Sequence, residues 1–184
     1  APYNPLEAVM KDANQAPSMA HLFGTDKLGR DVLSRILYGG AYSLSSVLAL
    51  VAIIFCVGTF LGLVAGYFGG LIDTVIMRIA DMMISFPGVI LAIAIAGIMG
   101  GSLVNAMIAL TAVTWTKYAR LSRSMVLKIR KRDFVDAAIV SGGTSSHILW
   151  THIMPNVVPI LVITAVSDIG AMMMELAGLS FLGF

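Results

Sequence analysis

The sequence has few charged residues and almost no cysteine. Charged side chains make up 12% of its 184 residues, and 58% of the residues are hydrophobic. A typical soluble domain has about 25% charged residues. The composition therefore excludes a soluble globular domain and a disordered chain, and it indicates a protein whose solvent is a lipid bilayer. The single cysteine, Cys56, lies in an apolar run, which excludes a disulfide framework and a cysteine metal cluster.

The sequence also lacks the motifs of nucleotide binding and of common catalytic sites. It contains no Walker-type phosphate loop, dinucleotide fingerprint or nucleophile–base motif. His147 and His152 are five residues apart, a spacing that does not place both on one face of an α-helix, so no metal site is predicted. The basic run at 117–132 has only Tyr118 as an aromatic residue and continues an apolar segment, so nucleic acid is not a predicted partner.

Long uncharged stretches predict four membrane-spanning helices. No charged residue occurs from 36 to 72 or from 82 to 116. A span needs about 20 apolar residues, so the second stretch is too long for one crossing, and Gly100 and Gly101 offer a break. The predicted spans are 43–69, 75–99, 103–122 and 157–176. The predicted fold class is all-α, a polytopic transmembrane helical bundle.

The distribution of positive charge predicts the orientation of these spans. Seven of the twelve Lys and Arg residues lie between 117 and 132, with no acidic residue among them. The positive-inside rule places this segment in the cytoplasm. Residues 1–40 are then an extracytoplasmic segment, and 41–184 are a transmembrane domain with a cytoplasmic loop at 123–155. Residues 1–20 have no apolar signal-peptide core, so we expect a fragment with at least one helix upstream.

Glycine residues in the first span predict close helix packing. Gly58, Gly62, Gly66 and Gly70 are four residues apart and share one helical face, and small residues at this spacing let two backbones approach. In the second span Pro87 predicts a kink, which suits a transporter and a purely structural helix equally well.

Residues 24–35, GTDKLGRDVLSR, predict a charged surface loop that leads into a helix. Alternating signs of charge and two glycines are typical of such a loop. Asp31 and Arg35 are spaced for an ion pair between residues i and i+4.

The loop that follows the third span predicts a helix, a glycine turn and a second helix. Asp136, Ala137 and Ala138 are followed by Gly142 and later by Pro155. Small alanine side chains permit close contact with a partner, glycine reverses the chain, and proline marks the start of the next helix. This hairpin is suited to a groove on another protein. A basic helix held by anionic lipid is the alternative, and it explains the charges but not the alanine and glycine pattern.

Acidic residues in the fourth span predict a polar lining. Asp168 and Glu175 are seven residues apart and so lie on nearly one helical face, together with Met172. Acids within a span usually face a bundle interior or an aqueous path, which makes these three residues a candidate translocation lining. In the alternative, Asp168 bonds a neighbouring helix and Glu175 is solvated near the outer interface.

The hairpin residues resemble the EAA loop of ABC importer permeases. That pattern is Glu-Ala-Ala, three residues, Gly, nine residues and I-x-L-P. Asp136 replaces the Glu, while Ala137, Ala138, Gly142 and Pro155 match. The motifs GTDKLGRD at 24–31, YAR at 118–120, Pro-Asn at 155–156 and LSFLG at 179–183 are similar to the C-type subunit of the dipeptide, oligopeptide and nickel branch. The departures are the Asp at 136 and Gly at 143, where the branch often has Ala.

This resemblance implies a permease of six helices, of which the chain holds helices two to five. It implies a second permease subunit in a heterodimer, two cytoplasmic ATPases, an external substrate-binding protein and alternating access in a bacterial or archaeal plasma (inner) membrane. ATP is then bound by the ATPases, so the permease is not an enzyme and has no cofactor of its own. The implied coupling residues are Asp136, Ala137, Ala138, Gly142 and Pro155.

The substrate and two other function classes stay open. Residues 168–183 look more like nickel-type permeases, but this resemblance covers only a short stretch. A dipeptide, an oligopeptide, nickel and a metal chelate therefore all remain candidates. A direct nickel site of Asp168 and thioethers is chemically weak, because thioethers prefer softer ions. The alternatives are a polytopic membrane enzyme that uses Asp168 and Glu175 as an acid pair, and a channel or structural subunit. Copurification of an ATPase separates the permease from both.

Overall fold

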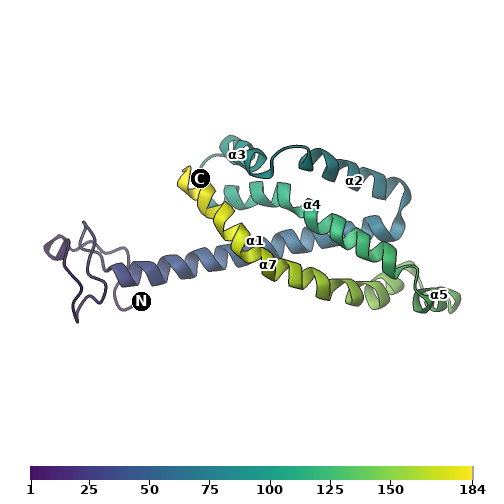
Figure 1. The fold of residues 1–184 in the computed structure, drawn as a ribbon, viewed down its shortest axis with the longest axis horizontal. Coiled ribbons are helices and arrows are strands. Elements are labelled where there is room, and N and C mark those ends of the chain that lie inside the picture. The colour runs from purple at the N-terminus through teal and green to yellow at the C-terminus, as the bar shows by residue number, and fades with distance from the viewer. Residues whose placement is uncertain (184) are drawn as a thin grey trace. The chain divides into compact units, whose positions relative to one another are not determined.

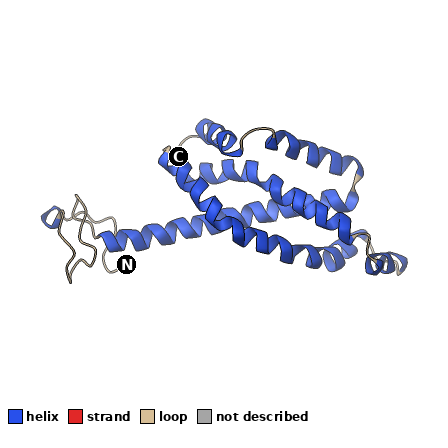
Figure 2. Cartoon of the chain, viewed as in Figure 1, coloured by secondary structure: helices blue, strands red, loops and turns tan. Residues whose placement is uncertain are grey.

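Helices account for nearly all of the chain after residue 31 (Figure 2). The computed structural model describes residues 1–183, and in that range the only β-structure is an isolated bridge between Thr25 and Asp31. The predicted all-α fold is confirmed. In chain order the elements are η1 (Met10–Asp12), α1 (Val32–Phe68), α2 (Gly70–Ile84), α3 (Gly88–Met99), α4 (Leu103–Ile129), α5 (Asp133–Val140), α6 (Ser145–His147), η2 (Ile148–Ile153) and α7 (Met154–Phe181).

The chain divides into two units, residues 1–46 and residues 47 onward. The boundary between these units falls inside α1. This helix begins at Val32, well before the predicted 43. It starts early because Asp31 caps it: the Asp31 carboxylate accepts a hydrogen bond from the Ser34 amide at 2.7 Å. Counting apolar residues alone does not detect a helix start within polar sequence.

Two aspartates organise the first unit. The carboxylate of Asp26 accepts hydrogen bonds from the amides of Leu28 at 2.9 Å and Arg30 at 3.0 Å, and it forms ion pairs with Arg30 and Arg35. Burial favours the neutral acid, but these hydrogen bonds outweigh it and lower the pKa of Asp26 to about 2. The predicted ion pair of Asp31 with Arg35 is wrong, because Asp31 contacts His21 at 3.0 Å.

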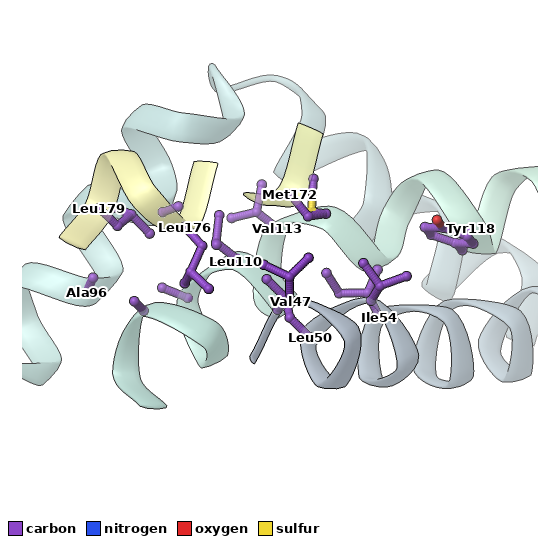
Figure 3. Close-up of a cluster of buried hydrophobic side chains, with 14 of the residues drawn as sticks. Val47, Leu50, Ile54, Ala96, Leu110, Val113, Tyr118, Met172, Leu176 and Leu179 are labelled. Carbon is purple, nitrogen blue, oxygen red and sulfur yellow. The ribbon is translucent and has the colours of Figure 1, made fainter. Parts of the chain in front are cut away.

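The second unit packs its helices around α4, which contacts α2, α3 and α7 (Figure 1). The larger hydrophobic cluster of this unit draws side chains from four helices (Figure 3). Its labelled members are Val47, Leu50 and Ile54 of α1, Ala96 of α3, Leu110, Val113 and Tyr118 of α4, and Met172, Leu176 and Leu179 of α7.

The glycines of α1 lie directly against α4. A Cβ atom at Gly58 would lie 2.5 Å from the Trp115 carbonyl oxygen, and one at Gly62 would lie 2.3 Å from that of Ala119. At Gly66 the nearest atom is the Cβ of Val126, at 2.8 Å. No side chain fits at these distances without a shift of the neighbouring helix.

Gly70 does not belong to this packing face. Helix α1 ends at Phe68, and Gly70 is the first residue of α2, where a Cβ atom would meet nothing within 4 Å. The predicted stripe therefore stops at Gly66.

Pro87 breaks the predicted second span rather than kinking it. Helices α2 and α3 end and begin on either side of Ser85–Pro87 and are bent by 93° at the break. Proline lacks an amide hydrogen and clashes with the preceding turn, and Gly88 adds backbone freedom beside it. The prediction of one helix over 75–99 is wrong, because two separate helices, α2 and α3, cover this range.

The number of helices that meet the criteria of a span is lower than predicted. In the described range α1 and the tract Ser145–Phe181 are long and apolar enough, and a third span results if α2 and α3 count as one bent pair. Helix α4 is long enough but not apolar enough to be counted with them, although the sequence predicted a span at 103–122. Its second half is basic, and it buries much of its surface against other helices, so it needs less apolar surface toward lipid.

The predicted helix, glycine turn and helix are present in the loop between α4 and α7. Helix α5 is followed by a turn at 141–143 and then by α6, the π-helix η2 and α7. Pro155 does not restart an interrupted helix as predicted. It lies in the first turn of α7, which continues directly from η2.

Candidate functional site

One side of helix α5 is anchored and the other is exposed. Val135 is fully buried and Ala138 is half-buried, and both pack against a second hydrophobic cluster. This cluster joins the hairpin to the long helices through Leu63 of α1, Val126 of α4, Ile148, Leu149 and Ile153 of η2, and Val157 and Leu161 of α7.

The exposed side of α5 carries two of the five predicted coupling residues. Asp136 and Ala137 are exposed. Two apolar neighbours that the sequence analysis did not select are exposed with them, Ile139 at 51% and Val140 at 88%. We call Asp136, Ala137, Ile139 and Val140 the α5 face. Large apolar side chains left open to solvent beside small ones are typical of a docking surface.

The turn after α5 is closed by two glycines. Gly142 has φ +82°, a left-handed conformation that favours glycine, and its amide donates to the Ile139 carbonyl at 3.0 Å. The Gly143 amide donates to the Ala138 carbonyl at 3.0 Å, and a Cβ atom at Gly143 would lie 2.8 Å from that oxygen. Close packing thus accounts for the glycine at 143, where an alanine would require a shift.

Pro155 lies outside the α5 face. It is exposed in the first turn of α7, where a missing amide hydrogen leaves no helical bond unmade. Beside it, the Asn156 side-chain amide donates to the His152 carbonyl at 2.7 Å. The structure therefore brings Asp136 and Ala137 together on one surface but gives Pro155 the role of starting α7.

Within the bundle, Asp168 of α7 is bound by two residues of α4. The Lys117 ammonium lies 2.7 Å from each carboxylate oxygen, and the Tyr118 hydroxyl donates to Oδ2 at 2.9 Å. The Asp168 side chain is 15% exposed. This geometry matches the alternative in which Asp168 bonds a neighbouring helix.

Met172 and Glu175 occupy different environments from Asp168. Met172 is 6% exposed and belongs to the hydrophobic cluster, so it packs the bundle rather than facing an open surface. Its burial counts against its predicted place in a polar lining. Glu175 is half-buried and makes no hydrogen bond or ion pair within residues 1–183.

Sequence reasoning missed the partners of the bundle's acidic residues. Besides Lys117, α4 uses Arg120 to pair with Asp81 and Arg123 to pair with Asp73, both on α2. These three cations are spaced at intervals of three along α4, so each is a neighbour of the next on the helix surface. The available signal was the match between cations in or beside the third predicted span and acids in or beside the second and fourth.

The arrangement is suited to transmitting motion from an exposed surface to the long helices. In the described part of the chain no three His, Cys, Asp or Glu side chains converge in a way that would hold a metal ion. The hairpin instead combines a buried side fixed to three long helices with an exposed side available to a partner. A displacement of the α5 face would therefore move α1, α4 and α7 together.

Relatives of this chain are transport permeases from several bacteria. It is 39% identical over 182 residues to the nickel transport system permease protein NikC of Escherichia coli, covering 99% of this chain and 66% of the relative. It is 43% identical over 169 residues to the dipeptide transport system permease protein DppC of Alkalihalophilus pseudofirmus, covering 92% and 56%. It is 40% identical over 170 residues to the glutathione transport system permease protein GsiD of Pectobacterium atrosepticum, with the same coverage.

The chain thus spans less than two thirds of the length of these curated relatives. A family model described as the binding-protein-dependent transport system inner membrane component matches residues 58–184, which include the α1 glycines, the ion pairs of α4 and the hairpin. The chain belongs to this family of inner membrane transport components.

Proposed function

We propose that the chain is part of a permease subunit of an ATP-driven importer, located in the plasma (inner) membrane of a bacterium or archaeon. A second permease subunit completes the pathway, two cytoplasmic ATPases supply the energy, and an extracytoplasmic binding protein delivers the substrate. The permease itself performs no catalysis and binds no nucleotide. The family match and the names of the relatives support this assignment.

The α5 face carries the proposal, because it is exposed, contains predicted coupling residues and is backed by the second hydrophobic cluster. Asp136 and Ala137 lie on this surface, and Val135 anchors its reverse side in the second hydrophobic cluster. The ATPase contacts the α5 face in this proposal. Gly142 shapes the turn behind it, and Pro155 positions the helix through which the motion enters the bundle.

The proposed substrates are nickel, a metal chelate, a dipeptide or an oligopeptide. The relatives named for nickel, dipeptide and glutathione have similar identities of 39%, 43% and 40%, so similarity does not favour one of them. Glu175 remains a candidate for the translocation lining because its carboxylate has no ionic partner within residues 1–183. Asp168 contributes to that lining only after its pair with Lys117 separates.

The ion pair between Lys117 and Asp168 disfavours the alternative of a membrane enzyme. An acid pair needs both carboxylates free to exchange protons with a substrate. Asp168 is instead held by Lys117 and Tyr118 at hydrogen-bonding distance.

The test is transport by the full-length transporter in liposomes, with Ala137→Arg as the variant. A long charged side chain in the middle of the α5 face should prevent ATPase docking while leaving the buried side of the hairpin intact. We expect copurification of the ATPase and ATP-dependent uptake of radiolabelled nickel or dipeptide to fall at least tenfold.

Met19→Arg is the matched control, because it adds the same charge at a residue of the first unit that is 95% exposed. It should leave uptake unchanged. Normal uptake and ATPase binding in Ala137→Arg would contradict the proposed docking surface. Absence of any ATPase from the unmodified transporter would contradict the importer itself.

A further inference from the structure

The π-helix η2 changes which residues of the cytoplasmic loop are neighbours. It covers Ile148–Ile153, directly after His147. A π-helix closes its hydrogen bonds between residues five apart, whereas an α-helix closes them between residues four apart. Side chains at i and i+5 therefore come onto one face. The five-residue spacing of His147 and His152, which argues against a shared face in an α-helix, favours one here.

The two imidazole rings are close and accessible. Their centroids lie 5.7 Å apart with the ring planes at 83°. His147 is exposed and His152 is half-buried. The intervening Ile148 and Leu149 and the following Ile153 are buried in the second hydrophobic cluster, so the backbone that carries the rings is fixed.

The hydrogen bond of Thr151 leaves one nitrogen of His147 free. The Thr151 hydroxyl lies 3.4 Å from Nδ1 of His147, which leaves Nε2 available to a ligand. The partner of one ring nitrogen commonly decides which nitrogen binds a metal. Imidazole suits Ni²⁺, Cu²⁺ and Zn²⁺, which bind it at about 2.1 Å. Two rings at this separation reach one such ion with a small side-chain rotation.

We propose that His147 and His152 bind one divalent transition-metal ion on the cytoplasmic loop, with water completing its coordination. The site has two protein ligands, so it exchanges its ion readily and does not hold it permanently. Bridging the rings fixes the π-helical register of η2. This proposal concerns binding alone, and it stands whether or not the chain couples to an ATPase.

The test is metal titration of the intact transporter in detergent after removal of every affinity tag. The calorimetric probe is Ni²⁺, and paramagnetic resonance of bound Cu²⁺ counts the coordinating nitrogens. We expect a Ni²⁺ site that weakens at least tenfold in both His147→Gln and His152→Gln. The Cu²⁺ spectrum should show two imidazole nitrogens in the unmodified protein and one in each variant.

His21→Gln is the control, because it removes the third histidine of the chain without touching the pair. It should leave both measurements unchanged. Each variant is first checked for assembly with its partner subunits, and His147→Gln, at an exposed position, keeps the test available if His152→Gln fails to assemble. Equal Ni²⁺ affinity in the unmodified protein and His147→Gln, or no binding to the unmodified protein, would overturn the proposal.

Discussion

Helix α4 contacts its neighbours in two different ways. Against α1 it meets a glycine surface, where Gly58, Gly62 and Gly66 bring the two backbones into direct contact. Against α2 and α7 it uses the ion pairs of Arg120, Arg123 and Lys117. Close packing depends on shape and tolerates no added atom, whereas an ion pair can separate and reform.

This difference predicts which helix contacts stay fixed and which rearrange during transport. The α1–α4 contact is suited to move as one body, because any sliding would drive the glycine positions into backbone atoms. The contacts of α4 with α2 and α7 are suited to rearrange, since their groups can exchange one polar partner for another. The predictions below test this division, beginning with the largest expected effect.

Gly62→Ala should be the most damaging small substitution in the bundle. The added Cβ lies 2.3 Å from the Ala119 carbonyl oxygen, so α1 and α4 must separate. We expect a loss of about 2 kcal/mol in the free energy of unfolding of the full-length permease in detergent micelles. Gly88→Ala makes the same change in α3, where the Cβ would lie 3.4 Å from Val113, and it should be nearly neutral. Equal effects would refute the special role of the glycine surface.

Asp168→Asn should weaken the contact between α4 and α7 without disrupting the fold. It removes the charge that Lys117 pairs with, at a site where Asp168 is 15% exposed and Lys117 is 53% exposed. We expect a loss of about 1 to 2 kcal/mol. The double variant with Lys117→Gln should recover part of this loss, because no unpaired charge remains. A double-mutant cycle measures the coupling, and strictly additive losses would show that the pair contributes nothing.

Asp81→Asn should have a smaller effect on the same measurement. Its pair with Arg120 has side chains that are 53% and 44% exposed, so solvent screens the interaction. A loss below about 1 kcal/mol is expected. A loss equal to that of Asp168→Asn would remove the distinction between the half-buried and exposed pairs of α4.

The ion pairs of Asp26 extend the comparison to the first unit, and here pH is the probe. The folded pKa of Asp26, about 2, is below its ordinary value of 3.8. The stability that the ionised Asp26 carboxylate gives to the folded first unit is therefore fully present above pH 4, and it is lost as the pH falls through about 2. Hydrogen exchange at the amides of Leu28 and Arg30, which donate to Asp26, should accelerate in that window beyond its intrinsic pH dependence. Asp26→Asn should abolish the extra acceleration.

Features that depend on local pattern could be predicted from the sequence. The existence of the long helices α1, α4 and α7, the glycine contact of α1 and the glycine turn of the hairpin all follow from spacing and backbone preference. Gly142 illustrates this well, because its left-handed φ is required by the turn that the sequence already indicated. The role of the α5 face in coupling stays a prediction.

Features that depend on which helices become neighbours could not be predicted. The partners of Asp168 lie about fifty positions earlier in the chain, and spacing alone does not reveal them. The π-helix likewise arises where the packing of Ile148, Leu149 and Ile153 overrides the usual helical period. At Pro87 the residue type was informative, but the angle of the break was not.

The break at Pro87 has a consequence for the surroundings of the protein. The first amides of α3, at Gly88, Val89 and Ile90, precede its first closed helical bond, and no side chain of residues 1–183 caps them. Phe86, Val89 and Ile90 are exposed around the same point. Hydrocarbon tails offer no hydrogen bonds, and each unsatisfied amide there costs several kcal/mol. Wherever this corner meets hydrocarbon, the open backbone therefore needs water or another polypeptide beside it in place of lipid.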